Sequence, residues 1–394
     1  MNEKLFTCSF FEHFENNKTP NTDFVITVTQ PEYSVEIDNS PSSRFNIIKS
    51  LHKINERPRI PFKKEEVEYR VSYENISNVE PKKAHALIPS RDSLELMKFT
   101  LSNLQANSVF DHVVPVIIDD RSCNQSAMKS LADQYKALYV RVDYDSTTFN
   151  FSVLNNIAAA FLDSMGVEDI ILWNSDLWVP DDQVIPSLLG KHKNNKRQNV
   201  YITGTKLLYP EKGFCNLFDD KQFAKTLSED IGISVDKVEK IAPHGKVQFG
   251  GSSITMSPFL SGQHPIIPVL LHYGRFLDRK EVNFDREILF MTGAFMLCDL
   301  KKYKEVGGLN PSMRFCHQDG DLCFKMREKN YRVMYYGKDH HLYHAESMSL
   351  ASKTEKSSGV NHKKTKTYNN ELFSNELIFA LRWNKDFAVG SFFL

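Results

Sequence analysis

From residue 84 onward, short apolar runs alternate with segments whose apolar residues recur every three or four positions. The runs, each too short for a buried helix but suited to a strand covered on both faces, are 85–89, 113–120, 137–143 and 170–173. The segments with helical periodicity are 93–107, 124–136 and 152–165. Strands that alternate with helices in this way predict βαβ crossovers, and therefore an α/β fold with a doubly wound, mostly parallel sheet.

The N-terminal part of the chain follows a different pattern. Alternating segments at 24–30 and 33–38 predict strands, and 57–66 is rich in proline and charge, as linkers are. We therefore expect a small β-rich region over residues 1–80. Nothing in it resembles a catalytic group of residues, and the sequence assigns it no function.

The chain is expected to continue with a main domain over 81–350 and a tail over 351–394. Within the tail, residues 370–384 have an apolar pattern compatible with a helix. Packing of this helix against the main domain is favoured over membrane insertion, because the apolar side of such helices usually faces a core. Anionic lipid remains an alternative partner, since the helix is preceded by Lys363, Lys364 and Lys366.

Polar residues follow three of the predicted strands at the point where each strand ends. They are Ser90, Arg91 and Asp92, then Asp119, Asp120, Arg121 and Ser122, and then Asn174, Ser175 and Asp176. Because the carboxyl ends of parallel strands meet at one edge of a sheet, where open α/β folds bind nucleotides, these clusters should converge. Each cluster alone also fits a solvated strand cap, but the three together predict a ligand site.

Two common phosphate-binding sequences are absent from the chain. No GxGxxG follows the first strand of the main domain and no GxxxxGK[ST] occurs anywhere, which excludes a dinucleotide fingerprint and a P-loop. The first turn, IPSRD, contains no glycine. A backbone cradle for phosphates is therefore disfavoured, and a divalent metal held by carboxylates is the expected source of positive charge.

Composition narrows the partners and the compartment. The chain of 394 residues has 49 basic and 49 acidic residues, so no nucleic-acid partner is expected. Its six cysteines form no CxxC pair and are expected to be free thiols in a reducing compartment. Without a signal peptide or a spanning apolar run, we expect a cytoplasmic protein with at most peripheral contact with the inner face of the cell membrane.

Ordered motifs along the chain resemble a known enzyme family. They are ALIPSRDSLELMKFTLSNL, VIIDDRS, FNFSVLNNIAAAF, ILWNSD, GTKLLYP, MTGAFMLCDLKKYKEVGGLNP, QDGDLCFKMREKNYRVMYY and LYHAES. In that order, over residues 84–350, they resemble family-2 glycosyltransferases with a GT-A fold. The resemblance is greatest to the bacterial branch that builds capsule, O-antigen of lipopolysaccharide and rhamnan-type polysaccharides. Relative to that family, about 219–242 looks like a helical insertion that bears on acceptor choice.

The resemblance implies a donor site built from several strand ends. Family members contact the nucleotide and donor sugar from positions that correspond here to Pro89, Arg91, Asp92, Asp119, Asp120, Asn156, Ser175, Thr292 and Gly293. A carboxylate suits such a contact because it accepts hydrogen bonds from a ribose hydroxyl or a base N–H. Turn capping is the alternative role for Asp120, and local helix capping the alternative for the region of Asn156.

The resemblance also implies a metal site. Asn174, Ser175 and Asp176 stand where the family has its DXD motif, and Asp176 is the strongest ligand for a hard cation among them. His344 matches the family's second ligand, for Mn²⁺ or Mg²⁺, with a structural histidine as the alternative.

The QDGD segment corresponds to the family's ED motif and places Asp319 as catalytic base, with Gln318 in place of the usual acidic or Asn residue. Asp321 opens the following helix and fits a favourable interaction with the helix dipole. The resemblance therefore implies an inverting transferase that moves a sugar from a nucleotide diphosphate to a hydroxyl of a glycan or lipid-linked glycan. The donor would be a UDP-sugar, with dTDP-rhamnose as its competitor.

Two other functions compete with this reading. Sugar-phosphate nucleotidyltransferases share the layered sheet, but they begin with a Gly-rich loop that IPSRD does not provide. A non-catalytic component that binds nucleotide sugar in a polysaccharide-assembly complex would not need to keep Asp176, Asp319 and His344 together.

Overall fold

The computed structural model describes most of the main domain and parts of both ends of the chain. The described residues are 23–32, 63–145, 149–217, 219–231, 234–258, 266–314, 316–346, and Asn375, Ile378, Phe379, Arg382 and Trp383. Within them, 12 strands form one sheet and two form a separate antiparallel pair. The sheet contains β1 (Asp23–Glu32), β2 (Lys63–Glu74), β3 (Ala84–Ser90), β4 (Val113–Asp120), β5 (Leu138–Tyr144), β6 (Asp169–Trp173), β7 (Leu177–Trp178), β8 (Val200–Leu208), β9 (Val247–Phe249), β12 (Asp285–Glu287), β13 (Phe295–Asp299) and β14 (Arg332–His344). The pair is β10 (Ser252–Pro258) with β11 (Ile266–His272).

Six strands of the sheet run in the same direction. β5, β4, β3 and β6 lie side by side in parallel. β13 pairs antiparallel with both β6 and β8, and β14 runs parallel to β8, so β8 and β14 point the same way as the first four strands. The carboxyl ends of these six strands therefore share one edge. The predicted α/β class with a mostly parallel sheet is confirmed.

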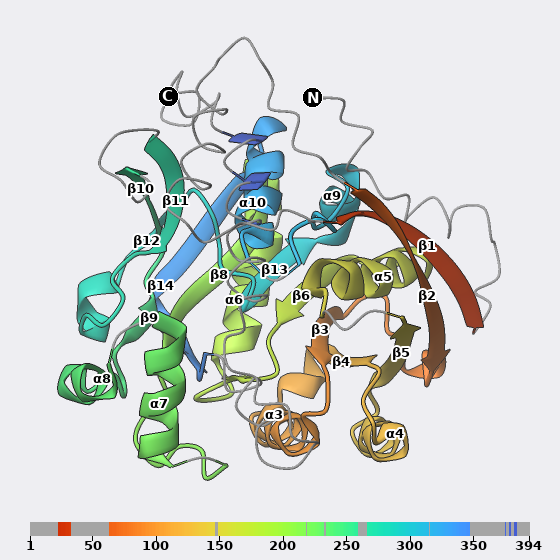
Figure 1. Ribbon diagram of the computed structural model, residues 1–394, viewed down its shortest axis with the longest axis horizontal. Coiled ribbons are helices and arrows are strands. Elements are labelled where there is room, and N and C mark those ends of the chain that lie inside the picture. The colour runs from red at the N-terminus through yellow and green to blue at the C-terminus, as the bar shows by residue number, and fades with distance from the viewer. Residues whose placement is uncertain are drawn as a thin grey trace.

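Helices cover both faces of the sheet. In Figure 1, α3 and α4 lie below β3, β4 and β5, and α5 lies above them. All twelve residues of α5 from Phe151 to Leu162 are buried, because this mostly apolar helix packs against both the sheet and α9 and its polar side chains are hydrogen-bonded internally. The helices are α3 (Leu94–Ala106), α4 (Gln125–Gln134), α5 (Phe151–Ser164), α6 (Val184–Asn195), α7 (Asp220–Ile231), α8 (Val235–Ile241), α9 (Leu300–Glu305) and α10 (Gln318–Glu328), with short 3₁₀ helices at Ile76–Asn78, Val109–Asp111, Lys196–Gln198 and Arg279–Val282.

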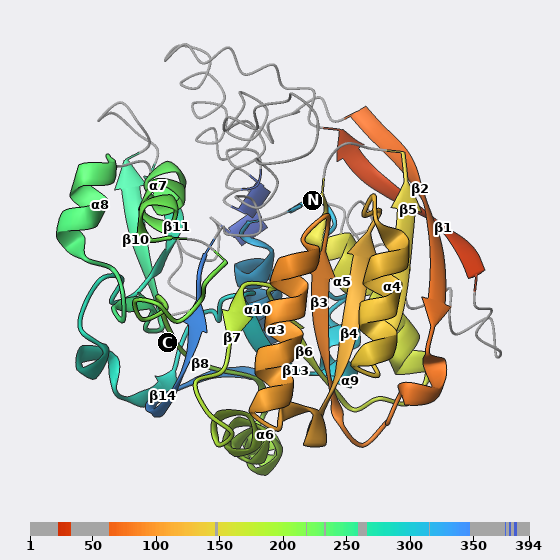
Figure 2. The same cartoon turned by 90° about the horizontal axis from the view of Figure 1, so that it is seen from below.

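The N-terminal strands extend this sheet (Figure 2). β1 pairs antiparallel with β2, and β2 pairs antiparallel with the edge strand β5, with Tyr69 opposite Tyr144. The strand predicted at 24–30 is confirmed as part of β1, and the one predicted at 33–38 lies outside the described residues. The segment 57–66, predicted as a linker, overlaps the first four residues of β2. The boundaries proposed at residues 80 and 350 stay predictions.

The predicted helical insertion and the predicted tail helix both fall partly within the described residues. Two helices, α7 and α8, occupy the segment at about 219–242. In the tail, Ile378, Phe379 and Trp383 are buried together with Met313 and Phe324, which agrees with the predicted packing against the main domain. The three lysines before that helix lie outside the described residues. None of the helices in the described part of the chain has the length and apolar character needed to cross a bilayer.

We predict that residues of the N-terminal strands stabilise the whole sheet. Tyr73 of β2 stacks on Phe161 of α5 with ring centroids 3.8 Å apart, and its hydroxyl donates to the carbonyl of Ile157. Tyr73→Ala should lower the free energy of unfolding by about 3–5 kcal/mol, as other large-to-small core substitutions do. Urea unfolding followed by tryptophan fluorescence would measure it, since the three tryptophans all lie beyond residue 170.

Val25→Ala is the matched control, because the Val25 side chain is 50% exposed. Its effect should stay within about 0.5 kcal/mol. An unchanged fluorescence transition in Tyr73→Ala would mean that residues 1–80 unfold as an independent unit.

Candidate functional site

The turns after β3 and β4 are joined by hydrogen bonds. Ser90 lies opposite Asp119 in the parallel register, so the two turns start at the same level. Asp92, in the left-handed region with φ 51°, donates its amide to Ser122 Oγ at 2.9 Å. Its Oδ1 accepts from the amide of Cys123 at 2.7 Å. The carboxylate of Asp92 therefore holds the second turn against the first.

Asp119 is fully buried and braces the interior of the sheet. Its Oδ1 accepts from the amide of Ser122 at 3.0 Å, and its Oδ2 accepts from Tyr139 Oη at 2.6 Å and Arg141 Nη1 at 2.8 Å. Pro89 is also buried, within β3. Because both oxygens of Asp119 accept hydrogen bonds within the protein, its surroundings favour a supporting role, while a donor contact by Pro89 stays a prediction.

Asp120 is the polar group of β4 that suits ligand recognition. Its Oδ1 accepts from Arg121 Nε at 3.2 Å, and Arg91 Nη1 lies 3.9 Å from its Oδ2. That buried Oδ2 accepts no hydrogen bond of good geometry from the described residues. Burial raises the pKa of Asp120, an effect that Arg121 and Arg91 oppose. Arg121 also lies 3.8 Å above the Tyr144 ring, so cationic and aromatic groups surround this carboxylate.

The prediction that Asn156 contacts the donor is not supported by its surroundings. The residue is fully buried in α5, and its Oδ1 accepts from Tyr303 Oη at 2.6 Å and from the amide of Leu309 at 2.9 Å. Its Nδ2 donates to the carbonyl of Leu309 at 2.8 Å. Asn156 thus holds the turn at 307–311 against α5, and we omit it from the candidate site.

The end of β6 meets the end of β14. His344 Nε2 lies 3.4 Å from Asp176 Oδ1 and 3.4 Å from Asn174 Nδ2. The chain holds this arrangement through the backbone, since the amide of Ala345 donates to the carbonyl of Asp176 at 3.0 Å. Thr100 Oγ1 donates a hydrogen bond to the backbone carbonyl of Ser175, so this contact involves the backbone of Ser175 and not its side chain. Residues 168 positions apart in sequence, Asp176 and His344, therefore present adjacent ligand atoms.

The separation of these two atoms fits a shared divalent ion. Two ligand atoms at about 2.1 Å from one octahedral ion and at right angles are about 3 Å apart, close to the observed 3.4 Å. Asp176 and His344 are 2% and 5% exposed, so little water competes for them. The described residues contain no cluster of three or more His, Cys, Asp or Glu suited to a metal. The pair would therefore be completed by water and ligand oxygens.

Asp319 lies beside this pair at the start of α10. Its Oδ2 accepts from the amide of Gly293 at 2.9 Å, and the carbonyl of Ala294 accepts from the amide of Asn174 at 3.0 Å. Two consecutive residues of the turn before β13, Gly293 and Ala294, therefore connect Asp319 to the turn that carries Asp176. A Cβ at Gly293 would meet Asp319 Cβ at 3.4 Å, so the glycine permits this close approach.

Thr292 precedes that glycine and is buried. Its Oγ1 accepts from the amide of Ala294 at 3.3 Å, an interaction that fixes the turn before β13.

Asp321 points to the other side of α10. It is fully buried, and its Oδ1 accepts from Trp383 Nε1 at 3.0 Å. Arg382 Nε lies 3.2 Å from the same Oδ1, and Lys325 Nζ lies 3.6 Å from Oδ2. Burial lowers the pKa of Lys325 to about 8, although Asp321 opposes that shift. Asp321 therefore binds the tail, in addition to the helix-dipole interaction expected from sequence. Asp319, in contrast, has a partly exposed carboxylate.

A polar group that sequence reasoning missed lies next to these residues. Glu346 accepts from Arg275 Nη2 at 2.7 Å, Tyr209 Oη at 2.9 Å and Gln248 Nε2 at 3.2 Å. The same Gln248 amide lies 3.1 Å from His272 Nδ1. Glu346 belongs to the LYHAES motif and could have been noticed there. Tyr209 likewise belongs to the GTKLLYP motif, whereas Gln248, His272 and Arg275 lie in none of the motifs.

His272 lies within electrostatic range of both functional groups. Burial and Arg275 lower its pKa to about 4, while the negative charge of Asp319 opposes the shift and His344 adds to it. The carboxylate predicted as base and the histidine predicted as metal ligand therefore influence the same ring.

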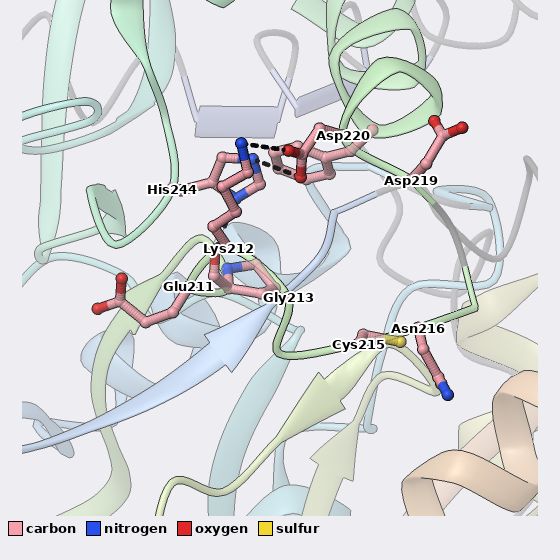
Figure 3. A pocket seen from close by; sticks show the side chains of 10 residues that line it. Glu211, Lys212, Gly213, Cys215, Asn216, Asp219, Asp220 and His244 are labelled. Atoms are coloured by element: carbon pink, nitrogen blue, oxygen red, sulfur yellow. Dashed lines mark hydrogen bonds and ion pairs between the residues drawn. The ribbon is translucent and has the colours of Figure 1, made fainter.

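A separate pocket of 320 Å³ lies beyond β8, beside α7. In Figure 3, Lys212 and His244 both approach Asp220, to which their distances are 2.8 Å and 3.4 Å. None of the predicted site residues lines this pocket. It is thus distinct from the strand-end site and belongs to the neighbourhood of the helical segment at about 219–242.

Comparisons with known proteins give limited information. No family model matches the chain. It is 25% identical over 266 residues to "Uncharacterized protein y4gI" of Sinorhizobium fredii (strain NBRC 101917 / NGR234), which covers 67% of this chain and 24% of that protein, so the chain spans about a quarter of that relative's length. A crystal structure of GalNAc-T7 with UDP, GalNAc and Mn²⁺ is similar over 67% of this chain and 44% of that chain, at 12% identity and a TM-score of 0.41.

We predict that Asn156 supports the fold and not the donor. Asn156→Ala would remove the acceptor of Tyr303 Oη and the donor to the carbonyl of Leu309 in a buried site, and the amide of Leu309 would keep only its 3.2 Å contact with Tyr303 Oη. The free energy of unfolding should fall by about 1–3 kcal/mol. The stabilisation that a nucleotide sugar gives should stay the same in thermal-shift measurements. Loss of that ligand-induced shift, with normal intrinsic stability, would restore Asn156 to the donor site.

Proposed function

We propose that the protein is an inverting, metal-dependent glycosyltransferase that uses a nucleotide-diphosphate sugar. The proposal depends above all on one observation, the convergence of Asp176, His344 and Asp319 at the carboxyl edge of the sheet. These residues come from three separate elements, and they combine a ligand pair for a hard cation with a partly exposed carboxylate. A strand-capping role accounts for each residue alone but not for their convergence.

The nucleotide would bind across the ends of β3 and β4. Asp120 Oδ2 is the acceptor available to a base N–H or ribose hydroxyl, and Arg91 and Arg121 beside it would meet the phosphates or the ring of the base. Asp92 and Asp119 would act by holding the two turns in place. The donor sugar would lie near Thr292 and Gly293, with the backbone of Ser175 beneath the diphosphate.

Asp176 and His344 would hold Mn²⁺ or Mg²⁺. When bound, the ion supplies positive charge that stabilises the departing nucleoside diphosphate. The chain's own part is to keep Asp176 Oδ1 and His344 Nε2 adjacent and largely out of water.

Asp319 would take the proton of the acceptor hydroxyl while the acceptor oxygen attacks the anomeric carbon of the donor sugar from the side opposite the leaving diphosphate. One displacement of this kind inverts the anomeric configuration, and no glycosyl-enzyme intermediate forms. The amide of Gly293 orients the carboxylate by binding Oδ2.

The donor we favour is a UDP-sugar, with dTDP-rhamnose as its competitor, and the acceptor we favour is a hydroxyl of a growing surface polysaccharide or a lipid-linked glycan. The resemblance to family-2 enzymes of capsule, O-antigen and rhamnan synthesis supports this choice. The helical segment at about 219–242 stays the predicted determinant of acceptor choice, on the strength of that resemblance.

A thermal-shift panel of nucleotide sugars with and without Mn²⁺ tests the proposal. A ligand at about 100 times its dissociation constant stabilises the native state by roughly 2.7 kcal/mol, which gives a measurable shift. We expect a UDP- or dTDP-sugar to raise the melting temperature only when Mn²⁺ is present. If no nucleotide sugar stabilises the protein under either condition, the donor site is wrongly assigned.

We predict that Asp176→Ala removes the metal while leaving the fold intact. Binding of Mn²⁺ can be followed by electron paramagnetic resonance, because the signal of the free aqua ion decreases on binding. The variant should leave that signal nearly unchanged, and chelation by EDTA should abolish transfer by the wild type. Asp182→Ala, an exposed neighbour that contacts Gln183, is the control and should bind Mn²⁺ normally. Equal Mn²⁺ binding by all three proteins would refute the ligand assignment.

We predict that Asp319→Asn separates binding from catalysis. The two oxygens of Asp319 accept the amides of Gly293 and Gly320, and asparagine keeps one of these contacts but cannot take up a proton, so transfer should fall by roughly 10² to 10⁴. Donor and metal affinity should be retained. Asp163→Asn, which weakens the pair with Lys304 at the end of α5, is the matched control and should transfer at the wild-type rate. A near wild-type rate in Asp319→Asn would mean that another group is the base.

A further inference from the structure

The tail contacts α10 on both sides of Asp319. Asn375 Nδ2 donates to Cys316 Sγ at 3.3 Å, and the ring of Phe379 stacks on His317 at 5.3 Å, both just before the helix. Just after Asp319, Trp383 Nε1 donates to Asp321 Oδ1 at 3.0 Å. In Figures 1 and 2, the dark blue pieces of the tail lie beside α10.

The first turn of α10 needs such support. It contains Gly320, and a glycine inside a helix costs about 1 kcal/mol relative to alanine because its backbone is more flexible. No larger residue fits, since a Cβ there would lie 2.2 Å from Leu270 Cδ1 and 3.5 Å from Phe379 Cε2. The residue before the helix, His317, has φ 62° and no side-chain cap. The turn that carries Asp319 is therefore poorly held by its own sequence.

The residue of α10 that binds the tail, Asp321, is buried and charged. Asp321 is fully buried, and its carboxylate faces Trp383, Arg382 and Lys325. Phe379 and Trp383 are 0% and 1% exposed and pack on Phe324 one turn further along α10. On the opposite side, Asp319 binds the amide of Gly293. The first turn of α10 is held between β13 and the tail.

We propose that Trp383 is a positioning residue for the reaction, acting through Asp321 to hold the turn that carries Asp319. The described residues of the tail then act as a strap that turnover requires because it holds the first turn of α10. This inference rests on the proposed function for its link to catalysis, while the physical coupling between tail and turn can be measured by itself.

The test uses Trp383→Phe in the full chain. Phenylalanine keeps most of the buried ring but cannot donate to Asp321. We expect kcat with a UDP- or dTDP-sugar to fall roughly 10- to 100-fold, the effect of a small misplacement of a catalytic group, with donor affinity unchanged. Amide hydrogen exchange over residues 316–321 should accelerate in the same variant.

Tyr73→Phe is the matched control, because it also removes one hydrogen bond from a buried ring, to the carbonyl of Ile157, on a strand remote from α10. It should keep the wild-type kcat and the wild-type exchange over 316–321. A wild-type kcat in Trp383→Phe, or an equal loss of kcat in both variants, would overturn the positioning role. If the wild type bound no nucleotide sugar, the proposed function would fail. Unchanged exchange in Trp383→Phe would then count against the strap independently of activity.

Discussion

The antiparallel ladder between β6 and β13 determines the geometry of the site. Phe295 pairs with Trp173, and the carbonyl of Ala294 accepts from the amide of Asn174 just beyond the last paired residues. A slip by one residue would move every side chain of the strand to the opposite face of the sheet, so the register of this ladder is strongly specified. The backbone hydrogen bonds therefore fix the relative position of the two strand ends. Gly293 and the turn that carries Asp176 are adjacent for this reason, and both Asp319 and His344 are positioned from them.

Charged side chains at this edge fall into two groups with different physical roles. Asp92, Asp119 and Asp321 have their acceptor oxygens directed at partners within the protein, so they fix turns and helices. Asp120 has a buried Oδ2 that accepts no hydrogen bond of good geometry from the described residues, Asp176 lies against the imidazole of His344, and Asp319 is partly exposed although both its oxygens accept backbone amides. A buried carboxylate is tolerated only when it is paired or hydrogen-bonded, so the buried Asp119 and Asp321 had to lie beside donors. The same residue type therefore serves both structure and chemistry along one sheet edge.

Segments outside the central strands cover the edges of the sheet and pack beside the candidate site. β1 and β2 cover the β5 edge that would otherwise be an exposed row of backbone groups. On the other side, Tyr209, Gln248, Arg275 and Glu346 form a hydrogen-bonded group next to His344, and the tail covers α10. These additions come from segments far apart in sequence, and the polar group around Glu346 and the tail contact β14 and α10, which carry His344 and Asp319.

The sequence by itself determined the alternation of strands and helices from residue 84, the α/β class and the three polar strand ends, because periodicity and apolar runs are local properties. It also singled out Asp176, Asp319 and His344 through motif order. Only the tertiary structure decided that Asp119 and Asn156 are saturated by internal partners, since Tyr139, Arg141 and Leu309 reach them through the fold. Likewise, the pairing of Asp321 with Trp383 joins residues 62 positions apart. Such contacts depend on how the elements pack, and no local pattern of residues encodes them.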